Sequence, residues 1–399
     1  MQTLGIITEY NPLHYGHAHL INRLREQLGS ETAVICVMSG NFVQRGDFAI
    51  MDKHSRAAAA VHCGVDLVVE LPLPYATAAA ADFARGAVET LVATGLLTHL
   101  GFGSECGDSA ALEEAAVALD HAHFPALLKQ ALSTGVSFPT AREQALRSLL
   151  GEKAALLSTP NNALAISYCQ ALQTIAPHVN VVTIPRIGAA HDGDTIGNIA
   201  SASGVRRLIE AGQDVSHLLP PPMATALEQA ITAGHAPVLA ETCQRGILAK
   251  LRTMTLDDYR QLDTSNEGLY HRFYRESRTA TSLEGLLSAV KTKRYPYARL
   301  RRMALWGYLG ISPQDIPDAV PYIRILAANG RGRTLLSQMR ATATVPILTK
   351  PADVSKLSDQ AQRLFQLEAT STDLYTLAYP DLSQAQGGQE WRQGPVMIE

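Results

Sequence analysis

Hydrophobic and polar residues follow two periods through the first half of the chain. Short unbroken apolar runs are typical of parallel strands buried on both faces, and they predict strands at Thr3–Thr8, Ala33–Met38, Val65–Leu71, His99–Gly103 and Val179–Pro185. Apolar residues that recur every three or four positions predict helices between them, at Tyr15–Leu28, Lys53–His62, Ala79–Thr94, Ser109–Leu119, Ala141–Leu150 and Asn162–Ile175. This alternation predicts an α/β fold with a Rossmann-like, doubly wound parallel sheet, in which ligands bind beyond the carboxyl ends of the strands.

The pattern changes after residue 217. Three consecutive prolines, Pro220 to Pro222, follow a helical stretch, and beyond them strand-like runs become rare. We therefore predict an α/β domain at residues 1–217 and a mainly α-helical region at residues 218–399. Residues 384–399 are polar and contain glycine, which predicts a loosely ordered end.

The composition is that of a globular protein with a sizeable core. The chain has 399 residues, of which 46% are hydrophobic and 18% are charged. The five cysteines are scattered without a C-x-x-C pair, so we expect reduced thiols and neither disulfides nor a zinc site. No apolar run reaches the roughly 18 residues that a membrane helix needs, and the N-terminus lacks the pattern of a signal peptide. We expect a cytoplasmic protein that has neither a membrane nor DNA as a partner.

Charge is distributed unevenly along the chain. The net charge is -3, but residues 250–350 hold 17 Lys and Arg against 8 Asp and Glu. A basic segment within an acidic chain is typical of a protein that binds a polyanion. The second half of the chain is therefore the expected place for such a partner.

The segment after the first predicted strand carries candidate chemistry. Asn11-Pro12 ends the strand, and His14, Gly16 and His17 open the next helix. Backbone N–H groups at a helix N-terminus attract anions, and a glycine lets a ligand approach closely. Because the two histidines are three residues apart on a helical turn, they point the same way and suit the stabilisation of negative charge on phosphates.

Other interpretations of this segment remain open. An H-x-x-H pair also occurs as surface histidines or as half of a metal site. The Walker A pattern G-x-x-x-x-G-K-[ST] is absent from the chain, and no G-x-G-x-x-G follows the first strand. These absences argue against a P-loop protein and a nicotinamide-binding protein.

A second polar segment follows the last predicted strand of the α/β domain. It runs from Ile199 to Arg206 and contains Ser201 and Ser203 at the start of another helix. Hydroxyl groups there can cap the helix and bind phosphate oxygens, and Arg206 adds a cation one turn later. A plain serine cap beside an exposed arginine is the alternative.

In this order, the two segments resemble the signature pair of the HIGH-type nucleotidyltransferase superfamily. Its members bind ATP on the pair, attack the α-phosphorus and release pyrophosphate. Further stretches resemble one family, the bacterial tRNA(Met) cytidine acetate ligases, almost continuously over the first 210 residues and in patches beyond. They include "GIITEYNPLHYGH" (5–17), "VMSGNFVQRGDFAIMDK" (37–53), "FGSECGD" (102–108), "STPNNALAISY" (158–168), "IPRIGAAHD" (184–192) and "KTKRYPYARLRR" (291–302). One departure is Gly204, where a larger residue is expected.

The resemblance implies an ATP-dependent ligase on a nucleotidyltransferase domain. Such an enzyme converts acetate and ATP into acetyl-adenylate and pyrophosphate, and then acetylates N4 of the wobble cytidine of elongator tRNA(Met) to give N4-acetylcytidine. We expect Mg²⁺ to bridge phosphate oxygens, and we assign it no protein ligand. The implied ATP-binding residues are Ile7, Thr8, Glu9, Tyr10, Asn11, Pro12, Leu13, His14, Tyr15, Gly16, His17, Ala18, His19, Leu20, Gly103, Asn161, Asn162, Arg186 and Ser201.

Catalysis of adenylation is mainly positioning and charge neutralisation. We expect His14 and His17 to stabilise charge on the α- and β-phosphates, and Ser201, Ser203 and Arg206 to hold the pyrophosphate. The loop Gly40-Asn41-Phe42 and Lys53 are candidates for lining the acetate pocket. The sequence indicates no general base for the acetyl transfer.

Residues 291–302 combine six cations and two tyrosines without an acid. Lys and Arg can follow a phosphate backbone, and Tyr can stack on splayed bases. We predict tRNA binding by Lys291, Lys293, Arg294, Tyr295, Tyr297, Arg299, Arg301 and Arg302. A solvated helix face is the alternative for this run.

Two other functions are compatible with parts of the chain. A small-molecule adenylyltransferase of cofactor biosynthesis would share both phosphate-binding segments but have no use for the basic segment. A non-catalytic RNA-binding protein would need neither the histidines nor Arg206. Pyrophosphate exchange and tRNA retardation distinguish these alternatives from the ligase.

Overall fold

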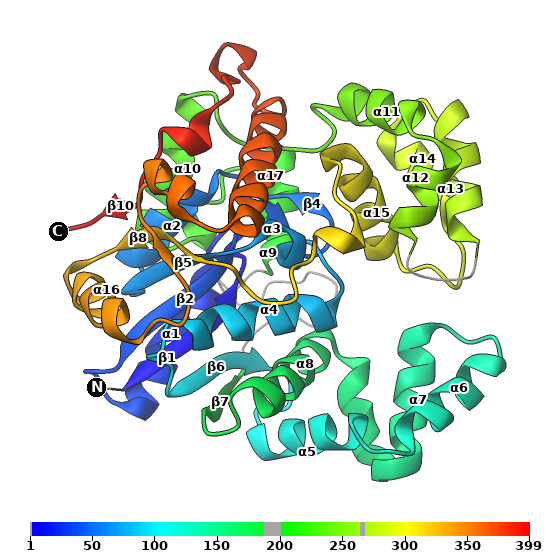
Figure 1. Ribbon diagram of the computed structural model, residues 1–399, viewed down its shortest axis with the longest axis horizontal. Helices are drawn as coiled ribbons and strands as arrows, with labels where there is room; N and C mark the ends of the chain where they lie inside the picture. Colours follow the sequence, from blue (N-terminus) through cyan, green and yellow to red (C-terminus); the bar gives the residue numbers. More distant parts are fainter. Residues whose placement is uncertain (1, 187–200, 264–267) are drawn as a thin grey trace.

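A mainly parallel sheet forms the centre of the molecule (Figure 1). The structure is a computed structural model that describes residues 2–186, 201–263 and 268–399. The strand order is β10-β8-β5-β2-β1-β6-β7, with β9 paired to β8. The strands are β1 (Thr3–Thr8), β2 (Ala33–Ser39), β5 (Leu67–Leu71), β6 (His99–Ser104), β7 (Asn180–Pro185), β8 (Ile323–Ala328), β9 (Ile347–Leu348) and β10 (Val396–Met397); β3 (Phe42–Val43) and β4 (Asp47–Phe48) form a separate hairpin.

The predicted α/β fold is confirmed. All five predicted strands are present, and β5, β2, β1, β6 and β7 pair in parallel. The predicted helices correspond to α1 (Tyr15–Leu28), α2 (Lys53–His62), α4 (Ala80–Ala93), α5 (Ser109–Leu119), α7 (Phe138–Leu150) and α8 (Pro160–Ile175). Two helices were not predicted, α3 (Leu73–Ala76) and α6 (Phe124–Ser133).

Alternate residues of each central strand enter different cores. On β2, Ile35 and Val37 belong to the core that α4, α5 and α8 cover. Val34 and Cys36 belong to the opposite core, which α1, α2 and α10 (Pro221–Thr232) cover. Burial on both faces explains why the strands read as unbroken apolar runs.

The last third of the chain returns to the central sheet. Strand β8 pairs antiparallel with β5, with Val68 opposite Ala327, and β10 pairs in parallel with β8. Helices α16 (Gly330–Thr342) and α17 (Asp359–Thr376) belong to this part. The predicted division at residue 217 therefore differs from the observed arrangement, because residues 323–328 and 396–397 complete the sheet of the first part.

A separate group of helices lies beside the hairpin β3–β4 (Figure 1). It consists of α11 (Gln244–Thr253), α12 (Leu256–Leu262), α13 (Leu269–Thr279), α14 (Leu283–Val290) and α15 (Tyr297–Leu309), and we call it the helical unit. The turn of the hairpin touches α15 so closely that a Cβ on Gly46 would lie 2.3 Å from the backbone nitrogen of Arg302. The hairpin is therefore one of the contacts that join the helical unit to the rest of the molecule, together with the hydrogen bonds from Trp306 to Thr77 and from Tyr308 to Leu374.

The end of the chain is anchored by a buried charge cluster. Lys53 forms ion pairs with Glu70 at 2.6 Å and with Glu390 at 2.7 Å, and Arg324 also pairs with Glu390. All four side chains are at most 5% exposed. The predicted loosely ordered end is thus wrong for Glu390, which lies in the core.

All five cysteines are free thiols. Among the described residues, no helix is long and apolar enough to cross a membrane.

Candidate active site

The turn between β1 and α1 places two histidines side by side at the carboxyl end of the central strand. His14 caps α1, and its Nδ1 accepts a hydrogen bond from the backbone N–H of Gly16 at 3.0 Å. Nδ1 of His17 accepts one from the backbone N–H of His14 at 3.2 Å. Because each Nδ1 is an acceptor, the neutral rings carry their protons on Nε2. Both Nε2–H groups are left to donate to a ligand at the N-terminus of α1.

Both histidines are neutral at pH 7. Burial lowers the pKa of His14 to about 4, and the nearby charges of Arg186 and Arg206 act in the same direction. Burial also lowers the pKa of His17, with contributions from His14 and Arg186. The ring centroids are 3.9 Å apart, so two charged rings would repel each other at this distance. The site thus offers neutral hydrogen-bond donors beside two fixed cations.

A buried arginine holds the strand ends that carry this turn. The Arg56 side chain is fully buried and donates hydrogen bonds to the carbonyl oxygens of Glu9 (2.5 Å), Met51 (3.0 Å), Ser39 (3.2 Å) and Gly40. It therefore joins the carboxyl ends of β1 and β2. We did not predict this residue, although an arginine within the apolar sequence of α2 was a signal for it.

The second predicted segment meets the first. Helix α9 (Ala202–Glu210) is capped by Ser201, whose Oγ accepts from the backbone N–H of Gly204 at 3.1 Å and lies 3.1 Å from Oγ of Ser203. Arg206 donates from Nη1 to the backbone carbonyl of Asn11 at 2.7 Å. Ser201, Ser203 and Arg206 thus belong to the same site as the histidines, whereas Ile199 and Ala200 lie outside the described residues.

Gly204 lies in the first turn of α9. A Cβ at this position would lie 3.3 Å from Oγ of Ser201, a tight contact. The serine cap is formed with glycine at this position, through the backbone N–H of Gly204.

Gly103 and Arg186 lie at the carboxyl ends of β6 and β7. The aliphatic part of the exposed Arg186 side chain crosses Gly103, where a Cβ would be 3.3 Å from Cγ of Arg186. These two residues lie on the β6 side of β1, next to the histidines, whose pKa values the Arg186 charge helps to lower. The predicted nucleotide-binding residues therefore share one end of the sheet.

Asn161 and Asn162 lie in the first turn of α8 and pair with Glu105. The carboxylate of Glu105 accepts from the Asn161 side chain at 2.7 Å and from the backbone N–H of Asn162 at 2.6 Å. Oδ1 of Asn162 accepts from the backbone N–H groups of Glu105 (2.9 Å) and Cys106 (3.2 Å). Asn162 thus ties α8 to the loop after β6, and Glu105 is a residue that we did not predict.

The other residues of the predicted ATP-binding segment, 7–20, differ in how deeply their side chains are buried. Tyr10 and Leu13 are buried in the core, and Tyr10 has a φ of 45°, a conformation that costs energy for a residue with a side chain. Ala18, His19 and Leu20 are half-buried on α1. The turn formed by residues 11–17 is therefore the part of the segment nearest a ligand.

Comparisons with known proteins agree with this geometry. The family described as HIGH Nucleotidyl Transferase matches residues 1–390. The tRNA(Met) cytidine acetate ligase of Acetivibrio thermocellus is 34% identical over 416 aligned positions, which cover 100% of both chains. The chain belongs to the HIGH nucleotidyl transferases and, among them, to the tRNA(Met) cytidine acetate ligase family. It is therefore an ATP-dependent ligase, as we predicted.

Two solved structures of this ligase family show the same fold. The apo form of Thermotoga maritima TmcAL has a TM-score of 0.95 and 33% identity, with 100% of each chain covered. The form bound to alpha-thio ATP has a TM-score of 0.93 at 33% identity, and the match covers 100% of this chain and 99% of that one. A ligase of the same fold thus binds an ATP analogue, which supports the prediction of ATP binding.

The basic segment is less exposed than its sequence indicates. Lys291, Lys293 and Arg294 are exposed, but Tyr295 is buried in the helical unit. Arg299 pairs with Asp263 at 2.9 Å and Arg301 pairs with Asp47 at 3.0 Å.

The remaining two residues of the basic segment also have partners within the protein. Tyr297 donates a hydrogen bond to Glu284. Arg302 donates from Nη1 to the backbone carbonyl of Gln44 at 3.5 Å, and burial and the nearby Arg299 lower its pKa to about 10. Of the eight predicted tRNA-binding residues, the first three are thus the most accessible.

The acetate candidates also lie deeper than expected. Lys53 is held between Glu70 and Glu390, and its backbone N–H donates to Oδ1 of the buried Asn41 at 2.9 Å. Phe42 packs against Phe48 and Tyr375. Asn41, Phe42 and Lys53 are each at most 5% exposed.

Proposed function

We propose that this chain makes N4-acetylcytidine at the wobble position of elongator tRNA(Met), using acetate and ATP. The observation that carries the proposal is the convergence of His14, His17 and Arg206 at the end of β1 in a member of this ligase family. The tRNA(Met) cytidine acetate ligase relatives supply the substrate by their name. We propose that the reaction takes place in the cytoplasm, where tRNA and ATP meet.

The first step needs stabilisation of charge on phosphates. An acetate oxygen attacks the α-phosphorus, and the bond from that phosphorus to the pyrophosphate oxygen breaks. The Nε2–H groups of His14 and His17 donate to the α- and β-phosphate oxygens without losing a proton, because both rings are neutral. Arg206 and the hydroxyl groups of Ser201 and Ser203 hold the leaving pyrophosphate.

Mg²⁺ has a place in this step through the nucleotide itself. Among the described residues, no group of three His, Cys, Asp or Glu side chains is arranged to hold a metal ion. Phosphate oxygens are the preferred ligands of Mg²⁺ in nucleotide sites, with several waters retained. The ion would therefore be carried by ATP and would neutralise phosphate charge.

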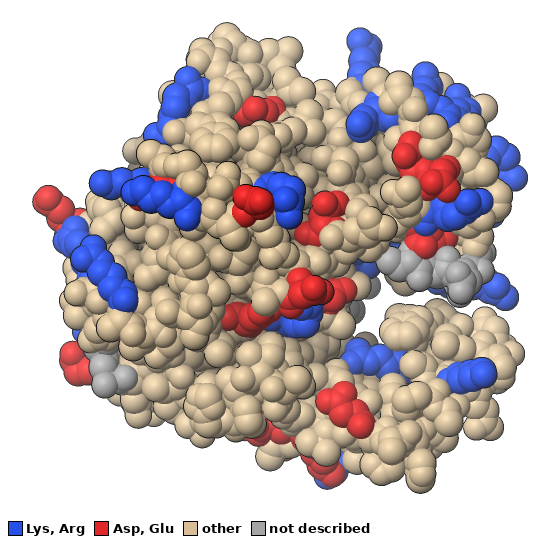
Figure 2. Space-filling view, viewed as in Figure 1, with Lys and Arg blue, Asp and Glu red and all other residues tan. Residues whose placement is uncertain are grey.

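The second step transfers the acetyl group to RNA. N4 of cytosine attacks the acetyl carbon, the bond from that carbon to the AMP oxygen breaks, and N4 loses a proton. The exposed Lys291, Lys293 and Arg294 precede α15 and can contact RNA phosphates. Lys and Arg side chains flank a hollow between the helical unit and the α5–α7 region (Figure 2), which suits a bound stem-loop.

One reaction tests the proposal. The protein is incubated with ATP, Mg²⁺, labelled acetate and total bacterial tRNA, and the nucleosides are then analysed. We expect label in N4-acetylcytidine and a matching amount of AMP. Absence of label from RNA, with an adenylylated small molecule formed when a metabolite extract replaces tRNA, would overturn the proposal.

A further inference from the structure

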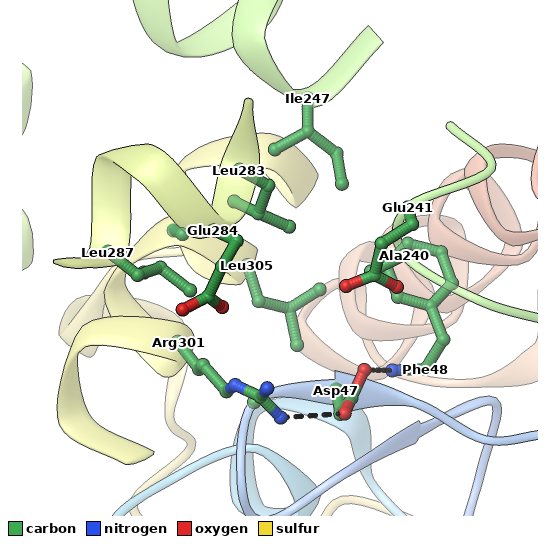
Figure 3. A pocket seen from close by; sticks show the side chains of 12 residues that line it. Asp47, Phe48, Ala240, Glu241, Ile247, Leu283, Glu284, Leu287, Arg301 and Leu305 are labelled. Carbon is green, nitrogen blue, oxygen red and sulfur yellow. Dashed lines mark hydrogen bonds and ion pairs between the residues drawn. The ribbon is translucent and has the colours of Figure 1, made fainter. Parts of the chain in front are cut away.

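A cavity of about 30 Å³ lies between the hairpin β3–β4 and the helical unit (Figure 3). We call it the hairpin cavity. It has room for about two water molecules, so a larger occupant enters only when the hairpin and the helical unit move apart. Most of the wall is apolar, from side chains such as Phe48, Leu283, Leu287 and Leu305. Three carboxylates, of Asp47, Glu241 and Glu284, and the guanidinium of Arg301 complete it.

The charged groups of the hairpin cavity are held in fixed positions. Arg301 donates to Asp47 at 3.0 Å and lies over the Tyr297 ring, 5.3 Å from its centroid. Oε1 of Glu284 accepts from the Tyr297 hydroxyl and from Ser288 at 3.1 Å. The carboxylates of Glu241 and Glu284 extend into the space from opposite walls (Figure 3). An entering molecule would therefore meet carboxylate acceptors on two sides. It would meet one donor, the Arg301 guanidinium, which also donates to Asp47.

The hairpin cavity lies next to the adenylation site. Arg206 and Glu210 are four residues apart on α9, so they share one face and are separated by about 6 Å along the helix. The charge of Asp47 acts on both of them, and the charges of Glu241 and Arg301 act on Glu210. One end of this face thus contacts the histidine turn, and the other lies close to the hairpin cavity.

The sheet order separates the hairpin cavity from the nucleotide base. Gly103 and Arg186, two of the predicted ATP contacts, lie at the carboxyl ends of β6 and β7, on one side of β1. The hairpin β3–β4 follows β2, which lies on the other side of β1. A nucleotide whose α-phosphate lies at the histidines and whose base lies over β6 leaves the β2 side open for the second substrate.

We propose that the hairpin cavity receives the acceptor cytosine, which is extruded from the RNA for acetyl transfer. This inference rests on the proposed function and adds the location and the recognition chemistry of the acceptor base. Enzymes that modify a base commonly bind it in such a pocket, between apolar walls and polar groups that read its edge. Phe48 supplies an aromatic side chain, and the leucines supply the apolar walls.

The polar groups match cytosine and oppose its close relative uracil. The exocyclic amine of cytosine is a donor, and carboxylates are the side chains that accept from it. N3 and O2 of cytosine are acceptors, which the Arg301 guanidinium can satisfy. Uracil has an oxygen in place of the amine and would place that oxygen against a carboxylate. Acetate, an anion, would be repelled by the three carboxylates.

Substitution of the two opposed glutamates tests this assignment. In the double variant Glu241→Gln, Glu284→Gln, we expect acetyl transfer to a stem-loop with wobble cytidine to fall at least 10-fold. A stem-loop with wobble uridine, added as a competitive inhibitor, should bind at least 5-fold more tightly than it binds the unmodified protein, because an amide can donate to the uracil oxygen. The control Glu228→Gln, at an exposed position of α10, should match the unmodified protein. Equal transfer and equal inhibition in the double variant would overturn the proposal.

A crosslink tests the same point without a substitution. A stem-loop that carries the photoreactive base 5-iodocytidine at the wobble position is irradiated with the full-length protein, ATP and acetate, and the attached peptide is sequenced. We expect attachment within residues 46–48, 283–287 or 301–305, and attachment within the α6–α7 region would overturn the proposal. If the unmodified protein acetylates tRNA but either test gives the contrary result, this inference fails alone. If the unmodified protein transfers no acetyl group to any RNA, the proposed function fails.

Discussion

The backbone N–H of His14 donates to Nδ1 of His17, so the residue that caps α1 also orients the second imidazole. Nδ1 of His14 is oriented in turn by the N–H of Gly16. Histidines are usually regarded as acid–base groups. Here the backbone holds both rings in place, and they act as neutral hydrogen-bond donors.

Replacement of His17 by alanine should nearly abolish adenylation. Loss of a preorganised donor to developing charge typically costs about 100-fold to 1,000-fold in rate, and we expect a loss of at least about 100-fold in AMP formation. tRNA affinity, measured by gel retardation, should stay within about 3-fold. His121→Ala, at an exposed position, is the control, and normal turnover of the His17 variant would contradict the assigned role.

Stability should decline when the pH falls below the ordinary histidine range. The pKa of His14 is lowered to about 4 in the folded protein and is about 6.5 when unfolded, so the unfolded chain binds more protons between these values. Stability is therefore full above pH 6.5 and declines towards pH 4. In His14→Gln, the difference in urea midpoint between pH 7 and pH 5 should be smaller than in the unmodified protein. An equal difference would show that His14 titrates normally.

A methyl group on Gly46 should loosen the helical unit. Gly46 has a φ of 76°, and its Cβ would lie 2.3 Å from the backbone nitrogen of Arg302. Gly212 has a φ of 68° with no atom within 4 Å of its Cβ position, so Gly212→Ala measures backbone strain alone, about 1 kcal/mol. Gly46→Ala should cost about 2 kcal/mol more in urea unfolding. Equal losses would show that the hairpin and α15 separate at little cost.

Removal of the Glu390 charge should destabilise the whole molecule. Lys53 and Arg324 are buried with it, and removal of one partner from a buried ionic cluster typically costs about 3–5 kcal/mol. We expect Glu390→Gln to lower the free energy of unfolding by that amount. Glu31→Gln removes the exposed partner of Arg331 and should cost less than about 0.5 kcal/mol. Similar values for both variants would contradict a structural role of the cluster.

Three exposed cations should contribute to RNA affinity. We expect the triple alanine variant of Lys291, Lys293 and Arg294 to bind tRNA more weakly and to show a shallower dependence on salt, by roughly one unit of slope for each lost phosphate contact. A matched triple alanine variant of the exposed Arg23, Lys356 and Arg392 removes the same charge away from the helical unit. An unchanged slope in the first variant would place the RNA elsewhere.

The sequence predicts well where the local pattern decides the structure. Helix α1 begins at Tyr15 and α2 at Lys53, as expected, because a capping residue precedes each and the apolar period is regular. Strand β8 was missed, since a single apolar run after many helices cannot be distinguished from a helical segment by periodicity alone. The ion pairs of Glu390 with Lys53 and Arg324 could not be predicted, because the three residues are far apart in the sequence.

The same distinction holds for the candidate site. The two phosphate-binding segments could be paired from their order and their resemblance to known motifs. Arg56 could not be assigned, because its role depends on four carbonyl groups from three segments that are separate in the sequence. The basic segment was overestimated, since sequence shows charge but not the Asp47 and Asp263 carboxylates that neutralise part of it.

The antiparallel pairing of β8 with β5 has a consequence for synthesis on the ribosome. Residues 67–71 emerge early, but their neighbour at residues 323–328 is translated only after the entire helical unit. Until then β5 presents an unpaired edge, which is a template for association with other chains. A nascent chain that stalls before residue 328 would therefore expose the edge of β5 that β8 covers in the folded protein.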